Sequence, residues 1–219
     1  MPLTPTTPRS LVDQAIEGMR DLLASGEWTV GTRIPPEPAL AESLGVSRNT
    51  VREAVRALAH TGVLEVRRGD GTYVAAPNEV TALVRQQLAR TDLRHVLEVR
   101  HAIESQAAAL AAERRTDADV EALERALERR SAAVARQDAG GFVDADADFH
   151  LGVVAAAHNP LLDELYGGFV DNLRTSILLP GPDEDALRAD HDALLTAIRD
   201  RDAAAAATAT AVLLAGVDH

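Results

Sequence analysis

Four polar residues lie close together in the segment SRNTVREAVRALAH, and their types suit contacts with nucleic acid. Arg48 and Arg52 carry forked guanidinium groups that can bind guanine edges or phosphates, and Asn49 can bind an adenine edge. Thr50 adds a hydroxyl donor for a phosphate. The apolar residues of the segment fall on the opposite face at about 100° per residue, so the spacing predicts an amphipathic helix. An ordinary polar surface helix remains the alternative when this segment is taken alone.

A second set of residues has the chemistry of metal ligands. Asp146 and His150 are four residues apart, which places them one turn apart on the same face of a helix. His191 lies on a later predicted helix and completes an Asp-His-His set, which suits Zn, Ni, Mn or Fe. Polar residues without a metal are the alternative. A metal-dependent enzyme is a further hypothesis, although no obvious general base accompanies the set.

Arg100 and Glu104 are a third pair at helical spacing. Because they are four residues apart, the simplest interpretation is an ion pair within one helix. Such a pair stabilises an exposed helix by only a few tenths of a kcal/mol.

The first group of residues needs a scaffold, and the sequence around it predicts one. Residues 9–25 carry an apolar stripe at helical spacing. Two further helical patterns meet at Gly45, and Ser47 can cap the second of them. The segment VLEVRRGDGTYVAAP alternates apolar and polar residues around a Gly-Asp-Gly turn, which predicts a hairpin of two short strands.

The order of helix, helix-turn-helix and hairpin predicts a winged helix-turn-helix domain over residues 1–77. In this arrangement Arg67 and Gly71 of the hairpin can follow the sugar-phosphate backbone of a duplex. The order of the elements is more specific than any one of them, and it favours DNA recognition by the helix that begins after Ser47.

Residues 78–219 have a different composition, with few Gly and Pro residues and with Ala, Leu, Asp, Glu and Arg at helical spacing. This pattern predicts an all-helical bundle as the second domain of a mainly α protein. The expected helices lie near residues 80–90, 93–114, 117–138, 141–157, 160–178, 184–200 and 203–216.

Composition excludes several classes of protein. Hydrophobic residues make up 46% of the chain and charged residues 26%, which is typical of a globular protein and not of a disordered one. The chain contains no Cys, so disulfides and thiolate metal sites are excluded. Because no signal-peptide pattern and no apolar run of about 20 residues is visible, we expect a cytoplasmic protein without a membrane span.

The net charge of −12 is unevenly distributed along the chain. Residues 1–78 contain 8 Arg and 9 acidic residues, whereas the remainder contains 14 Arg and 25 acidic residues. An acidic second domain argues against nonspecific binding of polyanions by the whole chain.

The segment PPEPALAESLGVSRNTVREAVRALAHTGVLEVRRGDGTYV resembles the signature of the GntR family of bacterial transcription regulators. The resemblance implies that Gly71 is the wing-tip glycine near the minor groove. The sequence departs from the family at Pro38 and Ala39, where Arg followed by Glu is usual and the Arg is commonly a DNA contact. The resemblance also implies that four residues of this chain occupy positions that read bases or hold phosphates: Arg48, Asn49, Thr50 and Arg52.

Three segments of the second domain resemble the helical effector domain of the FadR-type subfamily, called FCD: LEVRHAIESQAAALAA, DADFHLGVVAAAHNPLL and HDALLTAIRDRDAAAA. In metal-binding members, Asp146, His150 and His191 match three ligands of a site built from one Asp and three His. Leu213 stands at the position of the fourth ligand and cannot bind a metal. Three outcomes are open: a three-ligand site with water, replacement by another His, or loss of the metal.

The resemblance also gives Arg100 a place in the effector cavity, where it is expected to hold the carboxylate of a small organic acid. The chain is therefore expected to be a regulator and not an enzyme, with repression as the expected direction. We expect it to bind a pseudo-palindromic double-stranded DNA operator as a homodimer, with no membrane partner. A dimerisation bundle that binds no ligand is the remaining alternative for the second domain.

Overall fold

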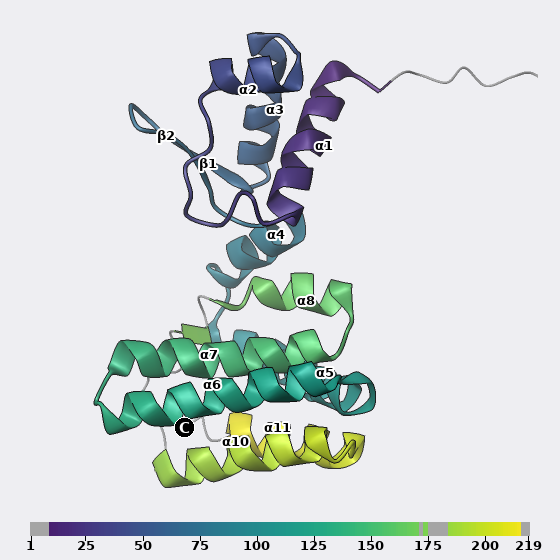
Figure 1. The fold of residues 1–219 in the computed structure, drawn as a ribbon, viewed down its shortest axis with the longest axis vertical. Helices are drawn as coiled ribbons and strands as arrows, with labels where there is room; N and C mark the ends of the chain where they lie inside the picture. The colour runs from purple at the N-terminus through teal and green to yellow at the C-terminus, as the bar shows by residue number, and fades with distance from the viewer. Residues whose placement is uncertain (1–8, 171–172, 175–183, 216–219) are drawn as a thin grey trace, which may run out of the picture. The chain divides into compact units, whose positions relative to one another are not determined.

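The computed structural model describes residues 9–170, 173–174 and 184–215 (Figure 1). Internal contacts divide the chain into two units, Met1–Leu83 and Val84–His219, and each is described by itself. The predicted division after residue 77 falls just before helix α4 (Glu79–Leu88), whereas the two units meet within that helix.

The first unit begins with helix α1 (Leu11–Ala24), which is capped by Ser10. The Ser10 side chain accepts a hydrogen bond from the backbone N–H of Asp13, and the Asp13 carboxylate accepts one from the backbone N–H of Ser10. Ala15, Met19 and Leu23 recur at helical spacing and are buried. This stripe contributes to a core against which helix α3 (Arg48–His60) also packs.

The helix-turn-helix is formed by α2 (Glu37–Leu44) and α3. Helix α2 ends at Gly45, whose φ of 66° lies in the left-handed region that side chains with a Cβ disfavour. Ser47 then begins α3, because its Oγ accepts a hydrogen bond from the backbone N–H of Thr50 at 3.1 Å. The predicted turn and the predicted cap are both confirmed.

The wing consists of strands β1 (Leu64–Arg67) and β2 (Gly71–Val74), which pair antiparallel. Their register places Leu64 opposite Val74 and Arg67 opposite Gly71. Arg33, in the loop before α2, forms an isolated bridge with Tyr73 and so ties this loop to the wing. The prediction of a winged helix-turn-helix domain is confirmed.

The second unit is a helical bundle (Figure 1). Its helices are α5 (Leu93–Arg114), α6 (Asp117–Ala135), α7 (Ala139–Ala156), α8 (Pro160–Gly167), α10 (Glu184–Arg199) and α11 (Ala203–Ala215). Helix α6 packs along α7, α5 packs against both α7 and α11, and α10 packs against α11. Many of the buried residues are Ala, whose small side chain lets helix axes approach closely. Ala206, in the run of alanines at residues 203–207, is fully buried.

One predicted helix is wrong in its extent. The expectation of a continuous helix over residues 160–178 fails because α8 ends at Gly167 and is capped at Gly168. Two successive glycines lower the helical propensity there, and a Cβ on Gly168 would lie 2.5 Å from Val84 Cγ1. Residues 171–172 and 175–178 lie outside the described residues. Among the helices that are described, none has the length and apolar character needed to span a bilayer.

Candidate functional site

Helix α3 separates its residues into a packed face and a free face. Val51, Ala54, Val55 and Leu58 are buried in the core of the first unit. Arg48, Asn49 and Arg52 are exposed, and Thr50 is half-buried, at the N-terminal half of the helix. The predicted amphipathic helix is confirmed, and contacts of these four residues with DNA remain a prediction.

Two of the predicted DNA contacts already have partners within the protein. The Nε and Nη2 atoms of Arg52 lie 3.1 Å from Oε2 of Glu37, the first residue of α2. The hydroxyl of Thr50 lies 2.9 Å from the Ser47 hydroxyl. Both side chains of the Arg52–Glu37 pair are about half-exposed, so the pair aligns the guanidinium group without removing it from solvent.

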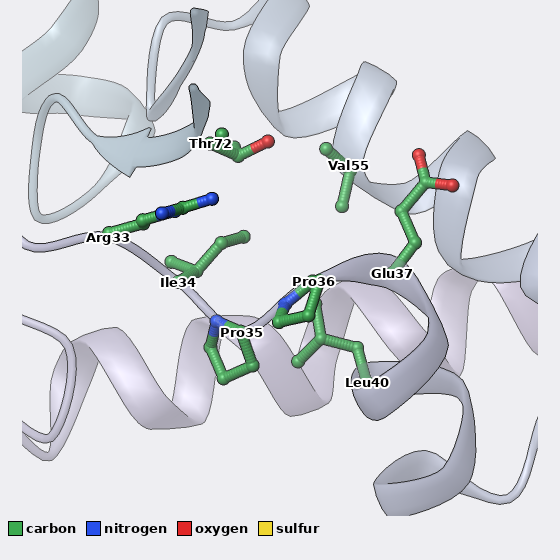
Figure 2. Close-up of a pocket in the computed structure, with 9 residues that line it drawn as sticks. Arg33, Ile34, Pro35, Pro36, Glu37, Leu40, Val55 and Thr72 are labelled. Carbon is green, nitrogen blue, oxygen red and sulfur yellow. The ribbon is translucent and has the colours of Figure 1, made fainter. Parts of the chain in front are cut away.

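Glu37 also lines a small hollow between the loop before α2, helix α3 and strand β2 (Figure 2). The hollow has a volume of about 190 Å³, and Ile34, Leu40 and Val55 supply apolar walls. Arg33 lies at its wing side, and it is not among the DNA contacts predicted from the sequence. Nothing in its local spacing marks Arg33, because its contact with the wing joins segments that are distant along the chain.

The structure corrects the location of Gly71. The tip of the hairpin is formed by Arg68, Gly69 and Asp70, and Gly71 is the first residue of β2. A Cβ at Gly71 would lie 2.4 Å from Nε of Arg33. The φ of Gly71 is 151°, a value that residues with a Cβ rarely adopt. Gly71 therefore directly follows the tip and provides space for Arg33 beside the wing, and its approach to the minor groove remains a prediction.

Arg67 is held along the wing by its neighbours. Its Nη2 atom lies 2.8 Å from Oε2 of Glu65, and its guanidinium carbon lies 4.1 Å from the centre of the Tyr73 ring. The Tyr73 hydroxyl in turn donates to Oδ2 of Asp70 at 2.9 Å. Arg67 is exposed, so it is free to approach a phosphate, and that contact remains a prediction.

In the second unit, the structure brings Asp146, His150 and His191 together. The three side chains are buried, and one possible ligand atom of each lies within 4.8 Å of the others. Nε2 of His191 lies 3.1 Å from Oδ1 of Asp146, and Nε2 of His150 lies 3.6 Å from Oδ2 of Asp146. The pair Asp146 and His150, predicted from their spacing on α7, therefore meets His191 of α10 in space, as the proposed set of three requires.

Arg100 and Glu104 belong to the same buried cluster. Nε of Arg100 donates to Oε1 of Glu104, which also accepts a hydrogen bond from the Tyr166 hydroxyl at 2.5 Å. Oε2 of Glu104 lies 2.7 Å from Nδ1 of His150. The pair within α5 is thus a buried one and not the solvent-exposed pair of ordinary helix surfaces.

Arg130 on α6 is a member of this cluster that the sequence analysis missed. Its Nε atom donates to Oδ1 of Asp146 at 2.6 Å, and the side chain is only 3% exposed. A signal was present in the sequence, because Arg130 falls on the same helical stripe as Leu123 and Ala133, both of which are buried. An arginine on an apolar stripe indicates a buried acidic partner.

The electrostatic environment keeps both carboxylates ionised. Burial alone would raise the pKa of Glu104, but His150 and Arg100 lower it to about 2. Burial would likewise raise the pKa of Asp146, but the hydrogen bond from His191 and the charges of His150, His191 and Arg130 hold it well below its usual range. These opposing effects indicate that the cluster depends on its internal pairing.

The fit of a divalent metal to this cluster can be tested on its donors. His150 is oriented as metal-bound histidines commonly are, because Nδ1–H donates to Glu104 and Nε2 faces Asp146. Two observations argue against a metal. Oδ1 of Asp146 already accepts a hydrogen bond from the Arg130 guanidinium group, and the position of the expected fourth ligand is occupied by the buried, apolar Leu213. The donor set is therefore incomplete, and its carboxylate is already paired with a cation.

The buried charges lead to the same conclusion. Among the described residues of the second unit, two arginines and two carboxylates are buried, and His150 and His191 are buried beside them. A divalent ion among them would leave an excess of positive charge in an environment of low dielectric. These residues do not fit a tightly held resident metal ion.

Comparison with known proteins assigns both units. A family model described as bacterial regulatory proteins, gntR family, matches residues 11–74, and a model described as FCD domain matches residues 95–216. The galactonate operon transcriptional repressor of Escherichia coli (strain K12) is 30% identical over 215 residues, which is 93% of each chain. The regulator LutR of Bacillus subtilis (strain 168) is 36% identical over 152 residues, covering 66% of this chain and 67% of the relative.

A solved structure agrees with this assignment. The chain is similar to a GntR protein of Streptococcus agalactiae with a TM-score of 0.65 and 29% sequence identity, over 94% of this chain and 98% of the other. The chain therefore belongs to the GntR family of bacterial regulatory proteins, carries an FCD domain, and is a DNA-binding regulator of transcription and not an enzyme.

Proposed function

We propose that the protein recognises its operator through the free face of α3. The observation that supports this proposal is the exposure of Arg48, Asn49 and Arg52 on a helix whose other face is firmly packed. Such a helix can enter a major groove with its N-terminal half, where the side chains can reach base edges and phosphates. Thr50 and the wing residue Arg67 would add contacts with the sugar-phosphate backbone.

The operator is proposed to be a pseudo-palindrome that a homodimer binds, because a two-fold dimer presents two identical helices to two half-sites. Repression is the proposed direction of control, since the Escherichia coli relative is named as a repressor. A cytoplasmic location is part of the same proposal, because the protein has to reach chromosomal DNA.

The effector is proposed to be a small organic acid. The name of the Escherichia coli relative refers to a galactonate operon, and galactonate carries a carboxylate. Arg100 is the proposed partner of such a carboxylate, since guanidinium groups bind carboxylates in a forked geometry. Because Arg100 is paired with Glu104, effector binding would require Arg100 to share or exchange this partner. The exchange would couple occupancy of the site to the packing of helix α5.

Control of DNA affinity is proposed to follow a population shift. The effector can change operator affinity only if it binds one arrangement of the DNA-binding domains more tightly than another. Of the three outcomes for the metal ligands Asp146, His150 and His191, the pairing of Asp146 with Arg130 favours loss of the metal.

The proposal for α3 is tested with DNA recovered by the protein from its own genome. Once sequencing has defined an operator, we expect Arg52→Ala to weaken binding by at least about 1 kcal/mol, which is about fivefold in the dissociation constant. Fluorescence anisotropy at one fixed salt concentration measures this change. Arg125→Ala is the matched control, because Arg125 is also an exposed arginine in an ion pair, on α6. Unchanged affinity in Arg52→Ala would contradict the contact assignment.

The effector proposal is tested by thermal shift with a panel of small organic acids, each with and without a divalent metal ion. A carboxylate effector is expected to raise the melting temperature in a concentration-dependent manner and to change operator affinity. If no acid shifts the melting temperature under either condition, the second domain is better described as a ligand-free dimerisation bundle.

A further inference from the structure

The strongest unexplained feature of the second unit is the buried contact between Arg130 and Asp146. Nε of Arg130 lies 2.6 Å from Oδ1 of Asp146, and both side chains are less than a tenth exposed. The guanidinium carbon also lies 4.5 Å from the centre of the Phe142 ring, which gives the cation a second favourable contact. A guanidinium group held by a carboxylate and an aromatic face has a defined position.

The partner of Arg130 is one of the three residues that resemble metal ligands. Asp146 is the only carboxylate in the Asp146, His150 and His191 set, so it is the ligand that would neutralise part of the charge of a metal ion. Arg130 already supplies positive charge at that carboxylate. A metal ion bound to Asp146 would have to share the carboxylate with a buried arginine or displace it.

Among the side chains that the structure describes, Glu104 is the one other buried acidic group that could accept a cation. The second buried carboxylate, Glu104, is engaged by Arg100, Tyr166 and His150. Leu213 is buried in α11 and is apolar, and by resemblance its position is that of the fourth metal ligand, a histidine, in metal-binding members. Among the described residues, the buried acids and arginines of the cluster therefore pair one to one.

We propose that Arg130 takes the place of a metal ion in this protein. Its guanidinium group compensates the charge of Asp146 and holds helices α6 and α7 together, so that the cluster keeps its arrangement without a metal. The protein is then a metal-independent member of a family in which related domains bind a metal. This inference concerns the cluster itself and does not rest on the identity of the effector.

The first experiment uses the unmodified protein. Wild type is expected to contain substoichiometric metal by elemental analysis, both as purified and after incubation with Zn²⁺ followed by gel filtration. Its melting temperature is expected to be the same in EDTA and in Zn²⁺. One tightly held metal ion per chain, or a lower melting temperature in EDTA, would overturn the proposal.

The second experiment removes the arginine. In EDTA, Arg130→Met is expected to lower the melting temperature by about 10 °C, because it leaves a buried carboxylate without its cation. Zn²⁺ is expected to restore most of this loss and to bind at one ion per chain, and Co²⁺ is expected to give the visible absorption of a protein-bound ion. The additional substitution Asp146→Ala is expected to abolish metal binding.

The matched control is Arg129→Met, because Arg129 is the adjacent residue on α6 but forms an exposed ion pair with Asp148. It is expected to shift the melting temperature by no more than about 2 °C and to gain no metal. Equal metal binding by Arg130→Met and wild type would contradict the exchange of arginine for metal. If Arg130→Met does not fold in either condition, the metal content and EDTA response of wild type still decide between the two outcomes.

Discussion

The two units of this protein differ in where important charged side chains lie: at the surface in the first unit and in the interior in the second. In the first unit, the arginines of α3 and the wing are exposed, and none of the buried side chains among the described residues carries a charge. In the second unit, Arg100, Glu104, Arg130 and Asp146 are buried among alanine-rich helices. A charge at the surface is solvated and available to a partner, whereas a charge in the interior must be compensated by its neighbours. The same residue types are therefore available to a binding partner in one unit and organise the interior in the other.

The largest effect is expected from removing an interior charge. Glu104→Gln leaves Arg100 without its carboxylate in a buried environment, and we expect it to lower the free energy of unfolding by about 3–5 kcal/mol. Urea denaturation measures the change. Glu98→Gln is the control on the same helix, because Glu98 is exposed and only weakly paired with Arg94. A loss as small as that of the control would show that the interior cluster is not tightly coupled.

A smaller effect, on binding and not on stability, is expected from an exterior residue. Asn49→Ala removes a side chain that is exposed on α3, and we expect operator affinity to fall by about 1–3 kcal/mol while the free energy of unfolding stays within about 0.5 kcal/mol of wild type. Anisotropy titration and urea denaturation of the same preparation separate the two quantities. Should stability fall with affinity, the free face of α3 would have an unrecognised structural role.

The smallest effect is expected at the boundary between interior and surface, at the start of α6. The Asp119 carboxylate completes a capping box with Thr116 and contacts Nε2 of His158 at 2.8 Å. We expect Asp119→Asn to cost about 1 kcal/mol at neutral pH. Asp163→Asn, an exposed acid in the first turn of α8, is the control.

The loss of stability in Asp119→Asn is expected to depend on pH in a defined direction. Partial burial raises the pKa of Asp119, but hydrogen bonds from Thr116 and His158 lower it overall below the ordinary value of 3.8. Its contribution is therefore fully present above the unfolded pKa and is lost as the pH falls below it. The stability difference between wild type and Asp119→Asn should shrink in acid, and a difference that grows there would contradict the assignment.

The fold could be predicted from sequence where short-range patterns decide it. The cap at Ser47, the glycine turn at Gly45 and the strand alternation of the wing each depend on a few neighbouring residues. Asp146 and His150 could be predicted as candidate metal ligands for the same reason, because they are one helical turn apart.

The features that sequence reasoning missed depend on contacts between distant segments. Arg130 meets Asp146 only because α6 packs along α7, and Arg129 beside it looks the same when only composition is considered. Arg33 reaches Gly71 through the folding of a loop onto the wing. Helical phase could have separated Arg130 from Arg129, whereas no local pattern identifies Arg33.

The close approach of Arg33 to Gly71 has a consequence for mutagenesis of the wing. Any side chain introduced at position 71 would force the Arg33 guanidinium group aside and would strain the backbone at the start of β2. The conformation of the Arg33 side chain and the backbone at the start of β2 would then change together. Weakened operator affinity in a Gly71 variant would therefore not by itself establish a direct contact between Gly71 and a nucleotide, because the same variant also disturbs Arg33 and the backbone of β2.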